Sequence, residues 1–184
     1  MDVKRFEISE VCLLRPHQHE DDRGWFAEIY NQDLLNRVLG TELSIVQDNV
    51  NRSTRVGTVR ALHLQNPPNA QGKLVRVTRG SIRDVAVDVR KGSPTYGGHV
   101  AVELRADRLE LFWVPPGFAH GFVTLAPETE VSFKTTAYYS PADEVGIAWN
   151  DPELGIDWGV SEAEAILSER DRMLPLFAAL RSQF

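Results

Sequence analysis

The sequence predicts a mainly β protein: a sandwich or barrel of short strands, with a few helical segments at its ends. Two observations support this prediction. Apolar and β-branched residues form short strand-like runs, and glycine- or proline-rich turn signals separate the runs about every 8–12 residues. The runs cover residues 74–78, 85–89, 99–104, 109–114, 122–125 and 131–136. Because ligands commonly bind in the mouth of such a sandwich, we expect a binding site there.

Helices are expected only near the two ends of the chain. Asn31 is a typical N-cap for a short amphipathic helix, and Gly40 should end that helix. Ser161 can cap a turn, and residues 174–180 are apolar enough to form a terminal helix. The sequence therefore predicts a C-terminal helical tail over about 161–184.

The composition is that of an ordinary globular protein. The 184 residues are 42% hydrophobic and 25% charged, which suits one domain over residues 1–184. A net charge of −6 argues against a nucleic-acid partner. Cys12 is the only cysteine, so the chain can form neither an internal disulfide nor a thiol–metal cluster. The chain lacks a signal-peptide pattern and any run of ~18–20 apolar residues, so we expect a cytoplasmic protein without a membrane partner.

Polar residues interrupt the apolar pattern in four places. The patterns are Asp22-Arg23-Gly24-Trp25-Phe26 with Glu28, Val46-Gln47-Asp48-Asn49, Val59 to Gln65 with Gln71-Gly72-Lys73, and Pro115 to Phe122. In a regular strand Arg60 and His63 would point to opposite faces, because alternate side chains share a face. A bulge or a bend would bring them together; otherwise Arg60 serves a neighbouring site. Taken alone, His63 fits a half-buried structural histidine, and Arg60 and Lys73 fit surface cations.

His120 follows a tight Pro-Pro-Gly turn and lies between two phenylalanines. A polar ring in such an apolar setting needs a hydrogen-bond partner or a ligand. The segment Pro115-x-Gly117-x-x-His120 also matches half of the metal-binding signature of cupins, but the His-x-His half is missing around His63. His17-Gln18-His19 has the spacing but lies in a loop-like stretch. Because a divalent metal needs three or more well-placed ligands, we expect no metal.

The ordered motifs resemble the dTDP-4-dehydrorhamnose 3,5-epimerase family of cupin-type deoxysugar epimerases. The matching segments are DDRGWF, VQDN, VRALHLQ, QGKLVRVTRGSIRDVAVDVRKGSPTYG, FWVPPGFAHGF, YYSPADE and WNDPELGIDW, with a fitting tail at Ser168-Glu169-Arg170-Asp171. The resemblance implies a cupin-like jelly roll and a homodimer that exchanges N-terminal strands from about 1–50. It also implies a dTDP-sugar substrate and neither a metal nor another cofactor.

The resemblance implies roles for individual residues. His63 is similar to the family's general base, Asp171 to the carboxylate that pairs with it, and Lys73 to the cation beside the C4 oxygen of the sugar. The residues that resemble substrate and nucleotide contacts are Arg23, Glu28, Gln47, Asn49, Arg60, His120, Tyr138, Glu144 and Arg170.

These roles suit the chemistry that the family implies. The protons at C3 and C5 of the sugar flank the C4 ketone, so removal of either proton gives an enolate. A neutral histidine can accept such a proton near pH 7, and a carboxylate on its other nitrogen fixes the tautomer. A lysine can stabilise the developing oxyanion, and arginines match a diphosphate with paired donors. The implied reaction converts dTDP-4-dehydro-6-deoxy-D-glucose to dTDP-4-dehydro-L-rhamnose.

One position departs from the family pattern. Inversion needs a proton delivered to the opposite face of the sugar, and the family's acid is a tyrosine at the position of Phe133. Phe133 is then an engineered change, or a natural residue with water or Tyr138 as the donor, or the mark of a protein that binds a nucleotide sugar without epimerising it. The residues are also compatible with a mono-epimerase that acts at C3 or C5 alone, and with a metal-dependent cupin. The nucleotide base and the pathway, L-rhamnose or an antibiotic sugar, stay open.

Overall fold

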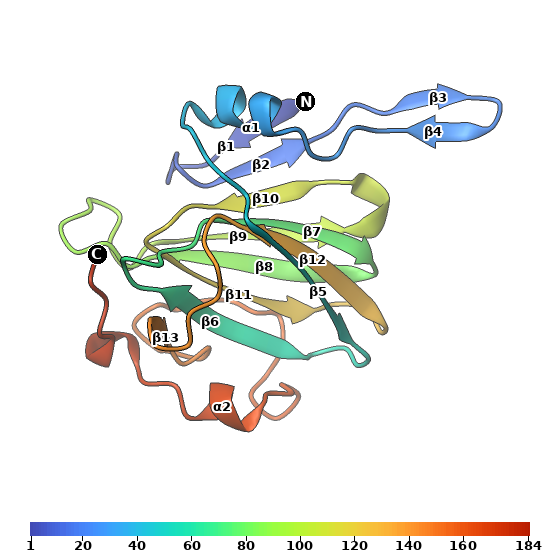
Figure 1. Ribbon diagram of the computed structural model, residues 1–184. Helices are drawn as coiled ribbons and strands as arrows, with labels where there is room; N and C mark the ends of the chain where they lie inside the picture. Colours follow the sequence, from blue (N-terminus) through green and yellow to red (C-terminus); the bar gives the residue numbers. More distant parts are fainter.

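The structure is a computed structural model that describes residues 1–184, and it consists mainly of two antiparallel sheets packed face to face (Figure 1). The six-stranded sheet has the order β1 (Asp2–Arg5), β2 (Cys12–Arg15), β10 (Leu111–Val114), β7 (Lys73–Arg79), β12 (Thr129–Thr135) and β5 (Gln47–Ser53). The five-stranded sheet has the order β13 (Glu144–Gly146), β6 (Val59–Gln65), β11 (Phe118–Thr124), β8 (Ser81–Asp88) and β9 (His99–Arg105). Two of the six predicted runs lie entirely within a strand and the other four extend beyond one by one or two residues, so the mainly β sandwich is confirmed.

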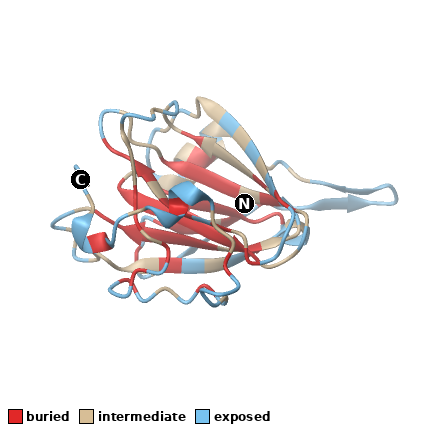
Figure 2. Cartoon of the chain, turned by 90° about the horizontal axis from the view of Figure 1, so that it is seen from below, coloured by how far each residue is buried: buried red, intermediate tan, exposed pale blue.

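Three apolar clusters hold the layers together. The first fills the space between the two sheets, where Val75 and Phe112 of one sheet face Ile82 and Phe118 of the other. The second lies on the outer face of the five-stranded sheet and is covered by the C-terminal segment. The third lies on the outer face of the six-stranded sheet, beneath the N-terminal helix. Figure 2 shows buried strands in the middle of the molecule and exposed segments around them.

The predicted N-terminal helix is confirmed as α1 (Gln32–Leu39). The Asn31 side chain accepts a hydrogen bond from the backbone N–H of Leu34, and Gly40 ends the helix in the left-handed conformation at φ 69°. Leu35 is buried against the outer face of the six-stranded sheet. The helix thereby covers apolar surface that would otherwise face water.

The predicted helical tail is wrong. The C-terminal segment contains only the short helix α2 (Glu169–Arg172) and the 3-10 turn η2 (Phe177–Ala179); a further 3-10 turn, η1 (Ala106–Arg108), follows β9. Pro175 lacks an N–H and disfavours a helical conformation in the residue before it. The backbone N–H of Phe177 donates instead to the buried carboxylate of Asp151 at 2.7 Å, so contacts with the body replace a helical ladder. Only the expected turn at Ser161 is present, with its hydroxyl donating to Glu164.

A bulge in β6 decides which of its side chains face the interior. His63 lies opposite His120, but Arg60 lies opposite Phe122, so β6 carries one more residue than β11 over this stretch. Ala61 and Leu62 both pack on the outer cluster, which leaves Arg60 and His63 on the inner face. The sequence left open a bulge, a bend, or a neighbouring site for Arg60, and the structure has the bulge.

A short hairpin extends away from the body. It is formed by β3 (His19–Asp21) and β4 (Gly24–Phe26), all six residues of which are exposed (Figures 1 and 2). Trp25 and Phe26 are 56% and 68% exposed, which is unusual for large aromatic residues in one small element. None of the helices in the structure is long and apolar enough to cross a membrane.

Candidate active site

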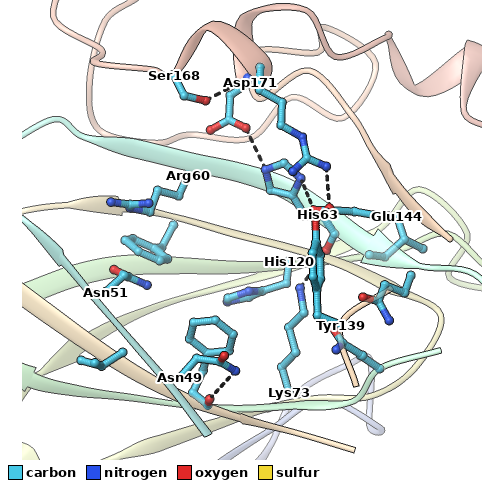
Figure 3. Close-up of a pocket in the computed structure, with 17 residues that line it drawn as sticks. Asn49, Asn51, Arg60, His63, Lys73, His120, Tyr139, Glu144, Ser168 and Asp171 are labelled. Carbon is cyan, nitrogen blue, oxygen red and sulfur yellow. Dashed lines mark hydrogen bonds and ion pairs between the residues drawn. The ribbon is translucent and has the colours of Figure 1, made fainter. Parts of the chain in front are cut away.

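A polar cavity of about 470 Å³ lies between the two sheets (Figure 3). The six-stranded sheet contributes Asn49, Asn51, Lys73 and Phe133; the five-stranded sheet contributes Arg60, His63, Gln65, His120, Phe122 and Glu144; the loop after β12 and the C-terminal segment add Tyr139, Ser168, Arg170 and Asp171. Elements far apart in the sequence therefore place charged and polar side chains in one cavity. Such convergence is typical of an active site.

His63 has the geometry of a general base. Its Nε2 lies 2.8 Å from Oδ1 of Asp171, whose side chain is 8% exposed. A neutral imidazole with Nε2–H donating to this carboxylate carries its lone pair on Nδ1. Nδ1 has no hydrogen-bond partner and lies 3.4 Å from Oε1 of Glu144. A second carboxylate thus stands ready to stabilise the imidazolium that forms when Nδ1 accepts a proton.

Asp171 reaches His63 because the C-terminal segment folds back over β6. Ser168 caps α2, and its hydroxyl accepts a hydrogen bond from the backbone N–H of Asp171 at 3.1 Å. This cap fixes the first turn of α2, so the Asp171 side chain is directed toward the five-stranded sheet. The pairing of His63 with Asp171 that the family resemblance implied is present in the structure.

Glu144 connects three groups at the edge of the cavity. Its Oε2 accepts hydrogen bonds from the Tyr139 hydroxyl and from the Arg170 guanidinium, each at 2.5 Å. Burial alone would raise the pKa of Glu144, but the hydrogen bonds from Tyr139 and Arg170 and the nearby His63 hold that pKa below its ordinary value. Glu144 is therefore a carboxylate at neutral pH, with its negative charge 3.4 Å from Nδ1 of His63.

Lys73 is a buried cation on the floor of the cavity. Burial lowers the pKa of Lys73 to about 8, although the carboxylates of Glu144 and Asp84 act in the opposite direction. Its ammonium group donates one hydrogen bond, to the backbone oxygen of His63 at 3.1 Å. An ammonium has two further donors, and these are available for an oxygen atom of a ligand in the cavity.

His120 belongs to a second histidine–aspartate pair. Its Nε2 lies 2.6 Å from Oδ1 of Asp84, a residue with no exposed surface. The other oxygen of Asp84 is buried without a hydrogen-bond partner. Sequence reasoning missed Asp84, although a signal was present: on the inner face of β8 it stands between the buried Ile82 and Ala86. A lone carboxylate on an apolar strand face needs a partner, and here the partner is His120.

Replacement of Asp84 by asparagine should shift the pH at which catalysis that depends on a charged Lys73 declines. Lys73 must be charged to stabilise an oxyanion, so kcat/KM should fall as the pH rises through about 8, the pKa of this lysine. The carboxylate of Asp84 raises the pKa of Lys73, so Asp84→Asn should move this decline to lower pH. A pH series of kcat/KM on both proteins measures the effect. Asp107→Asn on η1 is the control, and an unmoved decline in Asp84→Asn would reduce Asp84 to a structural role.

Amide and aromatic side chains complete the wall opposite His63. Gln47 and Asn49 point to the same side of β5, and the Gln47 amide donates to Asn49 at 2.7 Å. Gln47 also accepts a hydrogen bond from the backbone N–H of Tyr139 at 3.0 Å. Gln47 does not itself line the cavity, but it holds two residues that do, Asn49 and Tyr139. Phe133 on β12 lines the cavity on this side and presents no polar atom from its side chain.

Besides Gln47, three residues expected at the site lie outside this cavity. Arg23 is on the exposed hairpin, where its side chain contacts Asp21, and Glu28 is exposed beyond the hairpin. Tyr138 is 69% exposed and does not line the cavity, whereas the adjacent Tyr139 does. No three His, Cys, Asp or Glu side chains lie in an arrangement that could hold a metal ion.

The cavity combines a carboxylate-oriented histidine, a buried ammonium and several hydrogen-bonding groups. This set can remove a proton from a carbon beside a carbonyl and stabilise the enolate that results. Fold and site together define a jelly-roll enzyme of the isomerase class, one that moves protons on a carbonyl compound.

Comparison with known proteins gives the family. The family model for dTDP-4-dehydrorhamnose 3,5-epimerase matches residues 5–179. A dTDP-4-dehydrorhamnose 3,5-epimerase of Pseudomonas aeruginosa is 48% identical over 178 residues, 97% of each chain. The crystal structure of the enzyme from Elizabethkingia anophelis matches with a TM-score of 0.93 at 39% identity and covers 97% of both chains. The chain belongs to the dTDP-4-dehydrorhamnose 3,5-epimerase family, and the predicted cupin-like fold is confirmed.

Solved structures with a bound nucleotide or nucleotide sugar also match this chain. The 3,5-epimerase of Legionella pneumophila, in complex with dTDP-4-keto-L-rhamnose, matches with a TM-score of 0.91 at 39% identity, over 97% of this chain and 93% of that one. The prediction of an epimerase in deoxysugar biosynthesis is confirmed at the level of the family.

Proposed function

We propose that the protein converts dTDP-4-dehydro-6-deoxy-D-glucose to dTDP-4-dehydro-L-rhamnose by inverting C3 and C5. The observation that carries this proposal is the arrangement of His63 between Asp171 and Glu144, with the Lys73 ammonium bonded to the main chain of the same histidine. A base and an oxyanion-stabilising cation are thereby held next to each other. That is what removal of a proton beside a ketone requires.

The chemistry follows from these groups. Nδ1 of His63 takes the proton from C5 or C3, and the electron pair moves onto the C4 oxygen to give an enolate. Lys73 donates hydrogen bonds to that oxygen and offsets its charge. Asp171 holds the ring so that Nδ1 faces the sugar, and Glu144 stabilises the imidazolium. Return of a proton to the opposite face of the carbon completes each inversion.

The diphosphate of the nucleotide needs cations at the mouth of the cavity. Arg60 and Arg170 line the cavity from two different elements and have exposed side chains. An arginine can bind a phosphate with two parallel hydrogen bonds, which fixes both position and orientation. We assign the diphosphate to this side, which leaves the interior, with His63 and Lys73, for the sugar.

We further propose a homodimer in which the β3–β4 hairpin of one copy completes the cavity of the other. A two-stranded hairpin is barely stable in water by itself, and this one exposes Trp25 and Phe26. Arg23 is 89% exposed in its side chain and contacts only the neighbouring Asp21, so its family-implied role requires another molecule. A second copy would cover the exposed Trp25 and Phe26, and its cavity would place a substrate within reach of Arg23.

Mixed dimers can show whether Arg23 acts across the interface. His63→Asn removes the base of its own cavity, and Arg23→Ala should raise KM about 10–100-fold through loss of a charge-assisted hydrogen bond. If Arg23 serves the partner, co-expression of the two variants should recover sites with the KM of the unmodified protein, because one cavity in each mixed dimer has both residues. Light scattering should give the mass of two chains. A monomer, or no recovery in the mixture, would overturn the exchange.

The reaction itself is tested by proton NMR of dTDP-4-keto-6-deoxyglucose with the protein in D₂O. We expect deuterium at C3 and C5 and a product with rhamno configuration. Exchange at one carbon alone would make the protein a mono-epimerase. Tight binding of dTDP without any exchange would overturn the proposed reaction.

The place of the reaction in metabolism follows from its product. A dTDP-4-dehydro-L-rhamnose product would be reduced at C4 before transfer, as in the biosynthesis of L-rhamnose for polysaccharides. Antibiotic sugars are the other use that the family suggests. The nucleotide base, the cytoplasmic location and the absence of a metal stay predictions.

A further inference from the structure

Inversion requires a proton donor on the face of the sugar opposite His63, and Phe133 cannot be that donor. His63 extends from β6 of the five-stranded sheet, while the opposite wall is built by β5, β7 and β12 of the six-stranded sheet. Phe133 lines this wall and has no ionisable hydroxyl. Lys73 lies on the same sheet, but its ammonium is required at the enolate oxygen. The donor must therefore be water or another group that the chain places beside this wall.

Only one tyrosine lines the cavity. Tyr30 donates its hydroxyl to Gln32 near the outer face of the six-stranded sheet, and Tyr96 packs against Phe177 and lines a different pocket. Tyr138 is exposed and outside the cavity, whereas Tyr139 lines it. Tyr139 therefore has the one phenol that can reach the sugar.

Tyr139 enters the cavity from the wall that carries Phe133. It follows β12, and its backbone N–H is held by the side chain of Gln47 on β5 at 3.0 Å. Figure 3 shows its hydroxyl directed toward Glu144, beside His63. Gln65 of β6 holds the residues on either side, because its side chain donates to the carbonyl of Tyr138 at 3.1 Å and accepts from the N–H of Ser140 at 2.9 Å. The main chain of Tyr139 is therefore fixed between the two sheets.

The tip of Tyr139 also lies where the sugar must enter. Nδ1 of His63 is buried in the free protein, and its nearest carboxylate, Glu144, is the group that accepts the Tyr139 hydroxyl. A sugar that approaches Nδ1 has to separate this cluster. Tyr139 is 49% exposed, so its ring has room to turn back toward the wall from which it comes. For its hydroxyl to reach the face of the sugar opposite His63, the ring has to turn in this way.

We propose that Tyr139 donates the proton that completes inversion in this protein, in place of the residue at position 133; this inference rests on the proposed function. The Tyr139 O–H bond breaks, a C–H bond forms on the face opposite His63, and the enolate electrons return from the C4 oxygen. Tyr139 is left as a phenolate and regains a proton from water, while the His63 imidazolium releases its proton to water. The net change is an isomerisation with one solvent proton incorporated at each inverted carbon.

Arg170 is suitably placed to support this step. Its guanidinium and the Tyr139 hydroxyl meet at the same oxygen of Glu144 in the free protein. When Tyr139 turns away, Arg170 keeps Glu144 paired, so the carboxylate is not left without a partner.

The decisive experiment compares Tyr139→Phe with Tyr96→Phe in D₂O. We expect Tyr139→Phe to lower the rate of inversion by about 10²–10⁴, as loss of a general acid does, while deuterium still enters C3 or C5 with retention because His63 remains. Tyr96→Phe removes the hydroxyl of a tyrosine in a different pocket, so it is the matched control and should invert at nearly the original rate. Inversion by Tyr139→Phe at the rate of the unmodified protein would overturn the proposal.

A second pair of variants separates catalysis from folding. Phe133→Tyr provides another phenol on the same wall, so Tyr139→Phe should cost at least tenfold less inversion in that background than alone. An equal loss in both backgrounds would overturn the proposal, because it would mark a structural or binding role for Tyr139. If the unmodified protein shows neither exchange nor inversion, the proposed reaction itself fails, and that outcome is distinct from a failure of Tyr139.

Discussion

Replacement of His63 by asparagine is expected to remove both isotope exchange and epimerisation, with a loss of at least about 10²–10⁴ in rate. Asparagine can still donate a hydrogen bond toward Asp171, but it has no basic lone pair to replace that of Nδ1. No proton would then leave C3 or C5, so the enolate would not form. The measurement is the rate of deuterium incorporation in D₂O, followed for each carbon.

The affinity for dTDP and a control variant at another histidine distinguish loss of the base from loss of the fold. The affinity of the His63→Asn protein for dTDP, measured by titration calorimetry, should stay near that of the original, because we assign the diphosphate to the side of Arg60 and Arg170 and not to His63. His99→Asn changes a histidine of a different pocket and should leave exchange unaffected. Undiminished exchange in His63→Asn would require another base, and it would contradict the role of the His63–Asp171 pair.

The strands could be predicted from the sequence because their signal is local. Alternation of apolar and polar residues and the turns between them depend on neighbours along the chain. The tail is different: its shape depends on Asp151, whose carboxylate accepts the N–H of Phe177 from another part of the fold. The apolar residues alone suggested a helix there, but the contact between Phe177 and Asp151 determines the conformation.

The site shows the same division. Alternation alone separated Arg60 from His63, and only a bulge, which depends on pairing with β11, brings them together. Asp171 lies 108 positions from His63, so nothing in the local pattern connects them; the family motif did. Between two adjacent tyrosines, the sequence had no means to select Tyr139, because the segment after β12 is irregular and has no period from which to infer a face.

Replacement of Lys73 by methionine should have the other large effect, a loss of about 10²–10³ in kcat. Methionine nearly matches the lysine in length and is apolar, so it fits a buried position and removes only the charge and its donors. The enolate oxygen would then form without a cation beside it. Because this interaction strengthens as charge develops on oxygen, kcat should fall much more than the affinity for dTDP.

Lys73→Arg and Lys91→Met complete the test of Lys73 and show why its burial matters. Burial makes the ammonium costly to keep charged, which lowers its pKa to about 8, but it also removes the water that would weaken its contact with an oxyanion. Arginine keeps the charge at every accessible pH, so any activity retained by Lys73→Arg should lose the decline above pH 8. Lys91→Met alters an exposed lysine and should leave kcat and its pH dependence unchanged.

A Lys73→Met protein with nearly unchanged kcat would mean that another group stabilises the enolate. The second pair, His120 with Asp84, would then be the group to test.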